Sequence, residues 1–268
     1  MIAITVTNMK GGVGKTTLSM LLAKYIAADN PDLPVIVIDM DHQIGSTVLL
    51  NGTKQPTTPT ITNILQAIFD GEDCTGLISE AFINVESVCP NLYLIPADIA
   101  LAQFATNGSS IELLKQAIDS IKEVIFQNYS DACIIIDTGP LEHFVTMGME
   151  AADVVLVPVT LSDQTLIPSA RTIMMSFKLN KKYIGIVPSA VGTAKWESLS
   201  IESFSEKLQA HPIAEKSTCK LFQGIPHSRL LIRGDWLHNE KSILPEKFQE
   251  LVNSMYSEIS SHADMVGG

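Results

Sequence analysis

The chain has 268 residues, a hydrophobic content of 46% and a formal net charge of −11. This length suits one α/β domain with an ample core, and the acidic balance disfavours nucleic acid as a partner of the chain as a whole. No apolar run is long enough to span a membrane, the first residues read as a strand and not as a signal peptide, and four scattered cysteines without a CxxC pair disfavour zinc or a disulfide framework and suit a reducing cytoplasm.

The first chemical signature is the glycine-rich run at residues 10–17. Residues 2–7 before it are apolar and β-branched, as in a buried strand, and apolar residues at helical spacing follow it. Strand, glycine loop and helix together direct backbone N–H groups at phosphate. We therefore expect a phosphate-binding loop that binds ATP, in which Lys15 neutralises phosphate oxygens and Thr16 ligates Mg²⁺. The predicted nucleotide-binding residues of this loop are Lys10, Gly11, Gly12, Val13, Gly14, Lys15, Thr16 and Thr17.

Two further strands end in carboxylates. Residues 34–38 predict a buried strand that is followed by Asp39 and Asp41, and residues 132–136 predict a core strand that ends at Asp137. In open α/β sheets, ligands bind at the carboxyl ends of the strands. We expect Asp137 to hold Mg²⁺ through water, because Mg²⁺ keeps several waters when protein ligands are few.

The remaining periodic segments alternate between helix and strand. We predict helices over 60–69, 110–126, 167–177, 198–209 and 245–260, strands over 91–96, 151–159 and 183–188, and a short edge strand at 81–85. No repeat or long linker divides the chain. The prediction is one domain over residues 1–268, α/β and doubly wound, with a mostly parallel sheet and helices on both faces.

The lysine that opens the glycine-rich loop gives a more specific resemblance. The run Lys10-Gly-Gly-Val-Gly-Lys-Thr resembles the deviant Walker A loop of the ParA/MinD ATPases, in which the early lysine reaches across a dimer to the partner's nucleotide. Residues 39–43 resemble the first switch of that family, usually D-x-D-P-Q, and residues 138–140 resemble its second switch. His42 stands where the family has proline, which fixes φ.

The resemblance implies roles for several residues. Lys10, Lys15 and Asp41 would be catalytic, with Asp41 positioning or activating the attacking water. Asp39 would support the metal side together with Thr16 and Asp137. The segment 221–226 resembles a late family segment whose proline region packs near the base, so Pro226 is a candidate base contact.

The family also implies a function. We expect a slow, Mg²⁺-dependent, partner-stimulated ATPase that forms a homodimer on ATP binding and partitions plasmid or chromosomal DNA, in the cytoplasm and on the nucleoid. The expected partner is a ParB-like centromere-binding protein or an adaptor of another cargo. An alternative is the positioning of a protein cargo such as a carboxysome.

The distribution of charge supports a DNA contact. Residues 1–170 hold 6 Lys or Arg against 19 Asp or Glu, whereas residues 171–268 hold 12 against 10. A basic surface in the last third would bind DNA phosphates without reading sequence. The candidates for this surface are Lys178, Lys181, Lys182, Lys195, Lys216, Lys220, Arg229 and Arg233, and we predict contacts from Lys216, Lys220, Arg229 and Arg233.

Two other functions are compatible with the same phosphate-binding loop. A MinD-like membrane positioner needs a basic amphipathic C-terminal helix, but residues 245–268 are acidic, so we expect no membrane partner. A relative that performs electron transfer or biosynthesis, such as the nitrogenase iron protein or dethiobiotin synthetase, is the third reading. The cysteines do not follow the pattern of an iron–sulfur bridge, whereas composition alone does not exclude a ligase.

Overall fold

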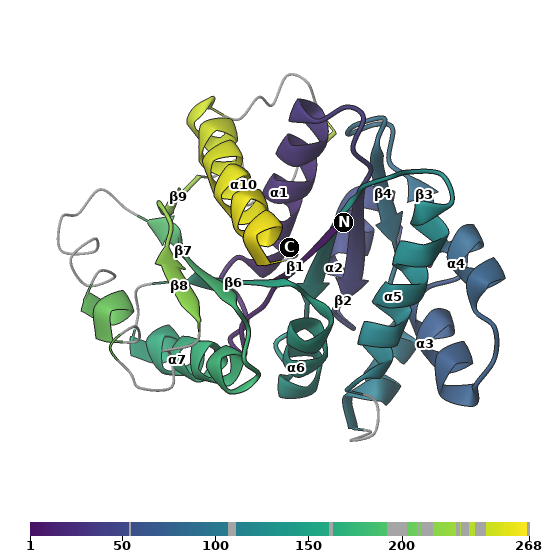
Figure 1. The fold of residues 1–268 in the computed structure, drawn as a ribbon, viewed down its shortest axis with the longest axis horizontal. Coiled ribbons are helices and arrows are strands. Elements are labelled where there is room, and N and C mark those ends of the chain that lie inside the picture. The colour runs from purple at the N-terminus through teal and green to yellow at the C-terminus, as the bar shows by residue number, and fades with distance from the viewer. Residues whose placement is uncertain are drawn as a thin grey trace.

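A computed structural model describes residues 1–53, 55–106, 111–160, 163–191, 203–207, 210, 217–228, 231, 236–238 and 245–266. These residues form one twisted sheet with helices on both faces (Figure 1). The strands are β1 (Ile2–Val6), β2 (Val35–Met40), β3 (Ile83–Asn84), β4 (Leu92–Ile95), β5 (Cys133–Thr138), β6 (Val154–Val159), β7 (Tyr183–Val191), β8 (Thr218–Leu221) and β9 (Ile225–Pro226).

The strand order is β3-β4-β2-β5-β1-β6-β7-β8, and β9 pairs with the end of β7. All pairings are parallel except that of β3 with β4. The central strands are buried along their whole length, which explains why their sequences are continuous apolar runs without alternation. The predicted fold class, α/β with a mostly parallel sheet, is confirmed.

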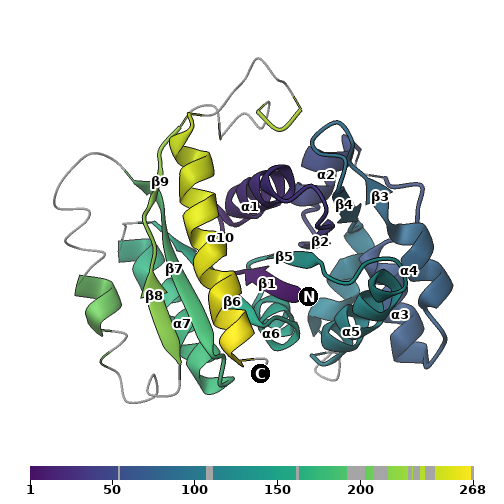
Figure 2. The ribbon, with the colours of Figure 1, turned by 45° about the horizontal axis from the view of Figure 1, so that its top comes forward.

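The helices cover both faces of the sheet, and all but the C-terminal α10 lie between strands in the chain. They are α1 (Lys15–Asp29), α2 (Gly45–Asn51), α3 (Ile61–Asp70), α4 (Thr75–Ala81), the 3₁₀ helix η1 (Ile99–Thr106), α5 (Leu113–Phe126), α6 (Glu142–Ala151), α7 (Asp163–Lys178) and α10 (Lys247–Val266). Helices α1 and α10 lie side by side on one face, and Figure 2 shows both crossing above the strands. Helices α3 to α7 cover the opposite face.

Four helical segments were not expected from the sequence: α2, α4, η1 and α6. Helix α6 shows the reason most clearly, because most of its side chains are buried between the sheet and neighbouring helices, so no polar face marks a helical period. The predicted 110–126 helix begins at Leu113. The prediction over 198–209 falls mostly outside the described residues, of which 203–207 are helical. No helix within the described ranges is long and apolar enough to cross a membrane.

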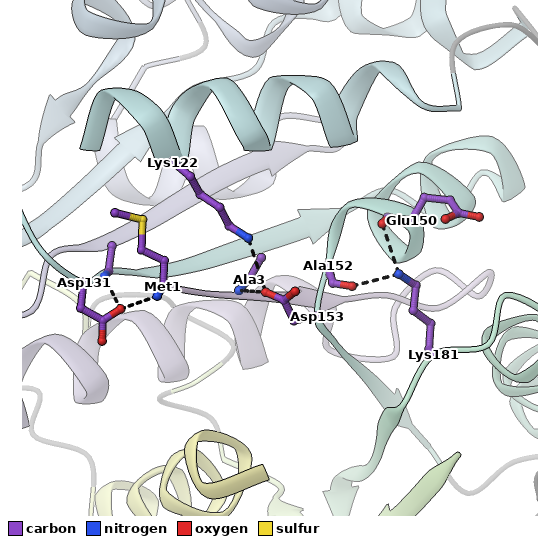
Figure 3. Close-up of polar contacts among 9 residues, drawn as sticks. Met1, Ala3, Lys122, Asp131, Glu150, Ala152, Asp153 and Lys181 are labelled. Atoms are coloured by element: carbon purple, nitrogen blue, oxygen red, sulfur yellow. Dashed lines mark hydrogen bonds and ion pairs between the residues drawn. The ribbon is translucent and has the colours of Figure 1, made fainter. Parts of the chain in front are cut away.

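A cluster of polar contacts lies at the end of the sheet where β1, β5 and β6 begin (Figure 3). The Met1 amino group pairs with Asp131 at 2.7 Å. Asp153 accepts from the Ala3 amide at 2.8 Å and lies 3.5 Å from the Lys122 ammonium. These contacts lie at the edge opposite to the glycine-rich loop, which follows the carboxyl end of β1.

Candidate nucleotide-binding site

Three adjacent parallel strands bring the predicted site residues together. Strand β5 lies between β2 and β1, and Asp137 is in register with Asp39 on one side and with Val6 on the other. The glycine-rich loop follows β1 directly, and the two predicted switches begin at the last residues of β2 and β5 and continue beyond them. Residues far apart in sequence therefore meet at one edge because the carboxyl ends of parallel strands point the same way.

The loop has the backbone of an anion cradle. Gly12 and Gly14 have φ angles of 75° and 92°, in the left-handed region that favours glycine. Gly14 also caps α1, so the first N–H groups of that helix face the loop. A Cβ at Gly14 would lie 2.5 Å from the Ser189 hydroxyl at the end of β7. The position therefore requires glycine for its conformation and for this close approach.

The two lysines of the loop are held by backbone contacts. The buried Lys15 ammonium donates to the Lys10 carbonyl at 3.1 Å, and the Lys10 amide donates to the Asn8 side chain at 2.9 Å. Burial lowers the pKa of Lys15, while the carboxylates of Asp137 and Asp41 oppose this shift. A phosphate group would replace the carbonyl as a stronger, charged partner for this ammonium.

Asp137 is fully buried and is surrounded by hydroxyl groups. It accepts hydrogen bonds from Ser19 at 3.1 Å and from Ser46. Burial raises the pKa of Asp137, and hydrogen bonds from Ser46, Thr16 and Ser19 and the Lys15 charge oppose the shift. The carboxylate thus lies beside the Thr16 hydroxyl, as the predicted pair of Mg²⁺-side residues requires.

Asp39, on the neighbouring strand, anchors the loop that leads into α2. One of its oxygens accepts from both the amide and the hydroxyl of Thr47 at 2.8 Å, and the other accepts from the Asp41 amide at 3.0 Å. Burial, and next the proximity of Asp137, raise the pKa of Asp39 to about 7, against these hydrogen bonds. These contacts favour a structural role for Asp39 in holding the first switch.

Asp41 lies at the rim of the site. Its Oδ1 atom accepts from the Gln43 amide at 2.9 Å and lies 3.5 Å from His42 Nδ1. A Cβ at Gly139 of the second switch would lie 2.9 Å from the same oxygen, so the two switches are in close contact. The arrangement places a carboxylate beside the loop without burying it completely.

A cavity of about 530 Å³ joins these parts and has the size of a small-ligand pocket. Its polar wall comes from the glycine-rich loop and Asp41, and its apolar wall includes Leu231, Trp236 and Leu237 near the C-terminal end of the chain. The Lys24 ammonium on α1 holds this apolar wall by donating to the Trp236 carbonyl at 2.5 Å. Pro226 lies on β9, where it pairs with Val191.

The predicted DNA contacts are only partly described. Lys216, Arg229 and Arg233 lie outside the described residues. Lys220, on β8, pairs with Glu258 of α10 at 3.1 Å. Lys181 donates to the carbonyls of Glu150 and Ala152 at the end of α6 (Figure 3), so it supports the fold.

Sequence reasoning missed several supporting residues of the site. Asn8 links the loop to the Pro158 carbonyl and to Ser169, and Ser19 and Ser46 contact Asp137. Only Asn8 had a local signal, because it immediately precedes the glycine-rich run. Serines in two separate helices cannot be assigned to one carboxylate before the fold is known.

The donor set fits ATP with Mg²⁺. A left-handed glycine cradle, a buried lysine and a hydroxyl beside a buried carboxylate match the needs of a triphosphate and a hard cation. Among the residues that the structure describes, no group of three or more His, Cys, Asp or Glu could hold a metal by itself. Where protein ligands are few, Mg²⁺ takes water and phosphate oxygens as its other ligands.

Comparison with known proteins identifies the family. Residues 1–182 match the family model described as AAA domain (AAA_31). The chain is 28% identical to the maintenance of carboxysome distribution protein A of Synechococcus elongatus over 80% of this chain and 84% of that protein. It is 34% identical to the sporulation initiation inhibitor protein Soj of Bacillus subtilis over 58% of this chain and 57% of that protein.

A solved structure of a Cyanothece McdA–ATP complex has the same fold, with a TM-score of 0.74 at 19% identity over 97% of this chain and 96% of that one. Because the family match spans more than half of the sequence, the chain belongs to the ParA/MinD family of AAA_31 ATPases.

Proposed function

We propose that this chain is a Mg²⁺-dependent ATPase that positions a protein cargo through an ATP-gated dimer. The observation that carries the proposal is that Lys15, Thr16 and Asp41 line one nucleotide-sized cavity, with the buried Asp137 directly behind Thr16. Phosphoryl transfer requires positioning and charge stabilisation more than covalent chemistry, and this arrangement supplies both.

Each residue has a separate task in the proposed reaction. The loop amides and Lys15 bind the phosphate oxygens, and Asp41 orients the attacking water beside the γ-phosphate. Thr16 and Asp137 would hold Mg²⁺, with Asp137 acting through water, and the ion would neutralise charge between the β- and γ-phosphates. Asp39 holds the Asp41 amide and the start of α2, so it fixes the geometry of the first switch.

Lys10 is assigned to the partner's site. Lys10 is half-buried at the start of the loop, and in the ParA/MinD family the early lysine reaches the nucleotide of the second subunit. Such a cross-dimer contact makes dimerisation depend on the γ-phosphate, so hydrolysis would release the dimer.

The carboxysome distribution relatives support a protein cargo, because their similarity extends over most of both chains. A second candidate is the partition of plasmid or chromosomal DNA, which is favoured by Soj and by the Caulobacter chromosome partitioning protein ParA, with higher identity over a shorter span. In both cases the dimer would bind DNA without sequence preference, and a partner protein would stimulate hydrolysis.

The dimer is tested with Lys10→Ala and Lys15→Ala. We expect the wild-type protein to hydrolyse ATP slowly and to dimerise with ATP in light scattering. Lys15→Ala should lose ATP binding, whereas Lys10→Ala should bind ATP and remain monomeric. Normal dimerisation and hydrolysis by Lys10→Ala would exclude the cross-dimer role.

The cargo is tested with the product of the neighbouring gene. We expect this product to stimulate ATP hydrolysis by the wild-type chain. A stimulating protein that binds a specific DNA site would favour DNA partition, and one that binds a protein assembly would favour the carboxysome-like function.

A further inference from the structure

We propose that His42 is a positioning residue for Asp41, whose carboxylate it orients through an Nδ1–H hydrogen bond. This inference deepens the proposed ATP hydrolysis and rests on it. The histidine immediately follows Asp41 in the loop between β2 and α2, so the two side chains belong to one short segment at the cavity rim.

One ring nitrogen of His42 is a buried polar atom without a hydrogen-bond partner among the described residues. His42 Nδ1 is buried, has no hydrogen-bond partner in the part of the chain that the structure describes, and lies 3.5 Å from Asp41 Oδ1. A buried donor without a partner lowers the stability of the fold. A closer approach by a few tenths of an ångström would bring the pair to about 3 Å, an ordinary hydrogen-bond length. The carboxylate oxygen is therefore the natural acceptor for this ring nitrogen.

The imidazole ring of His42 is held in place by a neighbouring helix. His42 packs on the fully buried Phe144 of α6, with ring centroids 6.2 Å apart and planes at 33°. Helix α6 begins directly after the second switch. The imidazole thus connects the first switch to the helix that follows the second switch, and its position depends on that helix.

The two carboxylate oxygens of Asp41 have different surroundings. Asp41 Oδ1 is enclosed by the Gln43 amide, by His42 and by the backbone at Gly139. With Oδ1 fixed in this way, Oδ2 is the oxygen that accepts a hydrogen bond from the attacking water. His42 would therefore act on the rate of hydrolysis through the orientation of Asp41 and not through contact with the nucleotide.

The kinetic test compares His42→Leu with His42→Asn. Leucine keeps apolar volume against Phe144 but removes the donor, whereas the asparagine amide replaces the N–H near the Nδ1 position. We expect His42→Leu to lower kcat for ATP at least tenfold with KM within about twofold, because misorientation of a reacting group can cost up to about 10²-fold in rate. His42→Asn should keep kcat within about threefold of the wild type.

The matched control is His143→Asn, since His143 also contacts Phe144, with ring centroids 6.4 Å apart. It should leave kcat within twofold of the wild type. Unchanged kcat in His42→Leu, an equal loss in His42→Asn, or a loss confined to KM would overturn the inference.

The measured activities distinguish a wrong role for His42 from a wrong proposed function. If the wild type hydrolyses ATP, Asp41→Asn does not, and His42→Leu is normal, only the role of His42 is wrong. If the wild type binds ATP without hydrolysing it under basal or partner-stimulated conditions, the proposed ATPase reaction itself is wrong, and the role of His42 falls with it.

A spectroscopic measurement tests the hydrogen bond without activity. In ¹⁵N–¹H correlation spectra that resolve the histidine rings, the His42 signals are those missing from His42→Asn. We expect Nδ1 to carry a proton in the wild type. A neutral His42 ring protonated only at Nε2 would overturn the proposal, because Nδ1 would then be unable to donate to Asp41.

Discussion

At the scale of single residues, the site contains buried carboxylates whose negative charges are not fully balanced by positive charges nearby. Asp39 and Asp137 face each other across neighbouring strands, and both are fully buried. Hydroxyl and amide donors surround them, yet desolvation still raises the pKa of each. Two ionised carboxylates in this buried position lower the free energy of unfolding. A site that binds a cation can tolerate this loss of stability because the charges are needed for function.

The pH dependence of stability follows from Asp39. Its pKa in the folded protein is about 7, above the ordinary value of 3.8, so between these values the native state binds more protons than the unfolded state. Stability should therefore fall as pH rises through this window, by at most about 1.4 kcal/mol per pH unit from this group. Asp39→Asn should remove this part of the slope. The measurement is the free energy of unfolding in urea at pH 5, 6 and 7, for both proteins without nucleotide.

The comparison of slopes is independent of the absolute stability of the variant. Asparagine at position 39 loses hydrogen bonds to Thr47 or to the Asp41 amide. The free energy of unfolding of the variant at any single pH therefore does not test the pKa of Asp39. Equal slopes in the two proteins between pH 5 and 7 would contradict the raised pKa of Asp39.

At the scale of elements, the contact of α6 with the sheet depends on one glycine. A Cβ at Gly148 would lie 2.6 Å from Thr138 Cγ2 and 2.7 Å from Thr5 Oγ1. Overpacking of this kind costs about 1–3 kcal/mol. Gly148→Ala should therefore lower the free energy of unfolding by about 1–2 kcal/mol, which urea denaturation can measure.

The matched control is Gly76→Ala in α4, where an added Cβ meets no atom within 4 Å. This variant should gain up to about 1 kcal/mol, because alanine loses less conformational entropy than glycine in a helix. A Gly148→Ala protein as stable as Gly76→Ala would show that α6 shifts easily on the sheet.

Helix α6 also shows which parts of the fold the sequence does not predict. Strands β1 and β5 are predicted by their continuous apolar runs, and helix α5 by its one apolar face. Helix α1 is buried on most sides, and its prediction depends on the glycine-rich loop that it follows directly. Helix α6 has neither an apolar run nor such a preceding loop. Within the site, Lys15, Thr16 and Asp137 belong to short motifs, whereas the contacts of Ser19 and Ser46 depend on how α1 and α2 pack and have no local pattern.

At the scale of the whole molecule, composition overstates the positive charge available to DNA. The last third is the more basic part of the sequence, but two of its lysines already have partners within the chain. Lys181 donates to carbonyls at the end of α6, and Lys220 pairs with Glu258. Any DNA contact in these regions would compete with intramolecular contacts.

DNA affinity in the presence of ATP should depend on this competition. If Lys220 contacts phosphate, Glu258→Gln should strengthen binding, because it removes the carboxylate that neutralises the ammonium. Lys220→Gln should weaken binding and reduce the slope of log affinity against log salt by about one, the loss of one phosphate contact. The measurement is fluorescence anisotropy with a duplex of arbitrary sequence over a series of salt concentrations.

The two variants change the local charge in opposite directions at the same ion pair, so they control for each other. A general effect of unfolding would lower affinity in both, whereas a phosphate contact predicts opposite signs. Wild-type affinity and salt slope in both variants would place DNA away from Lys220. In that case the basic residues outside the described part of the chain, Lys216, Arg229 and Arg233, would be the remaining predicted contacts to test.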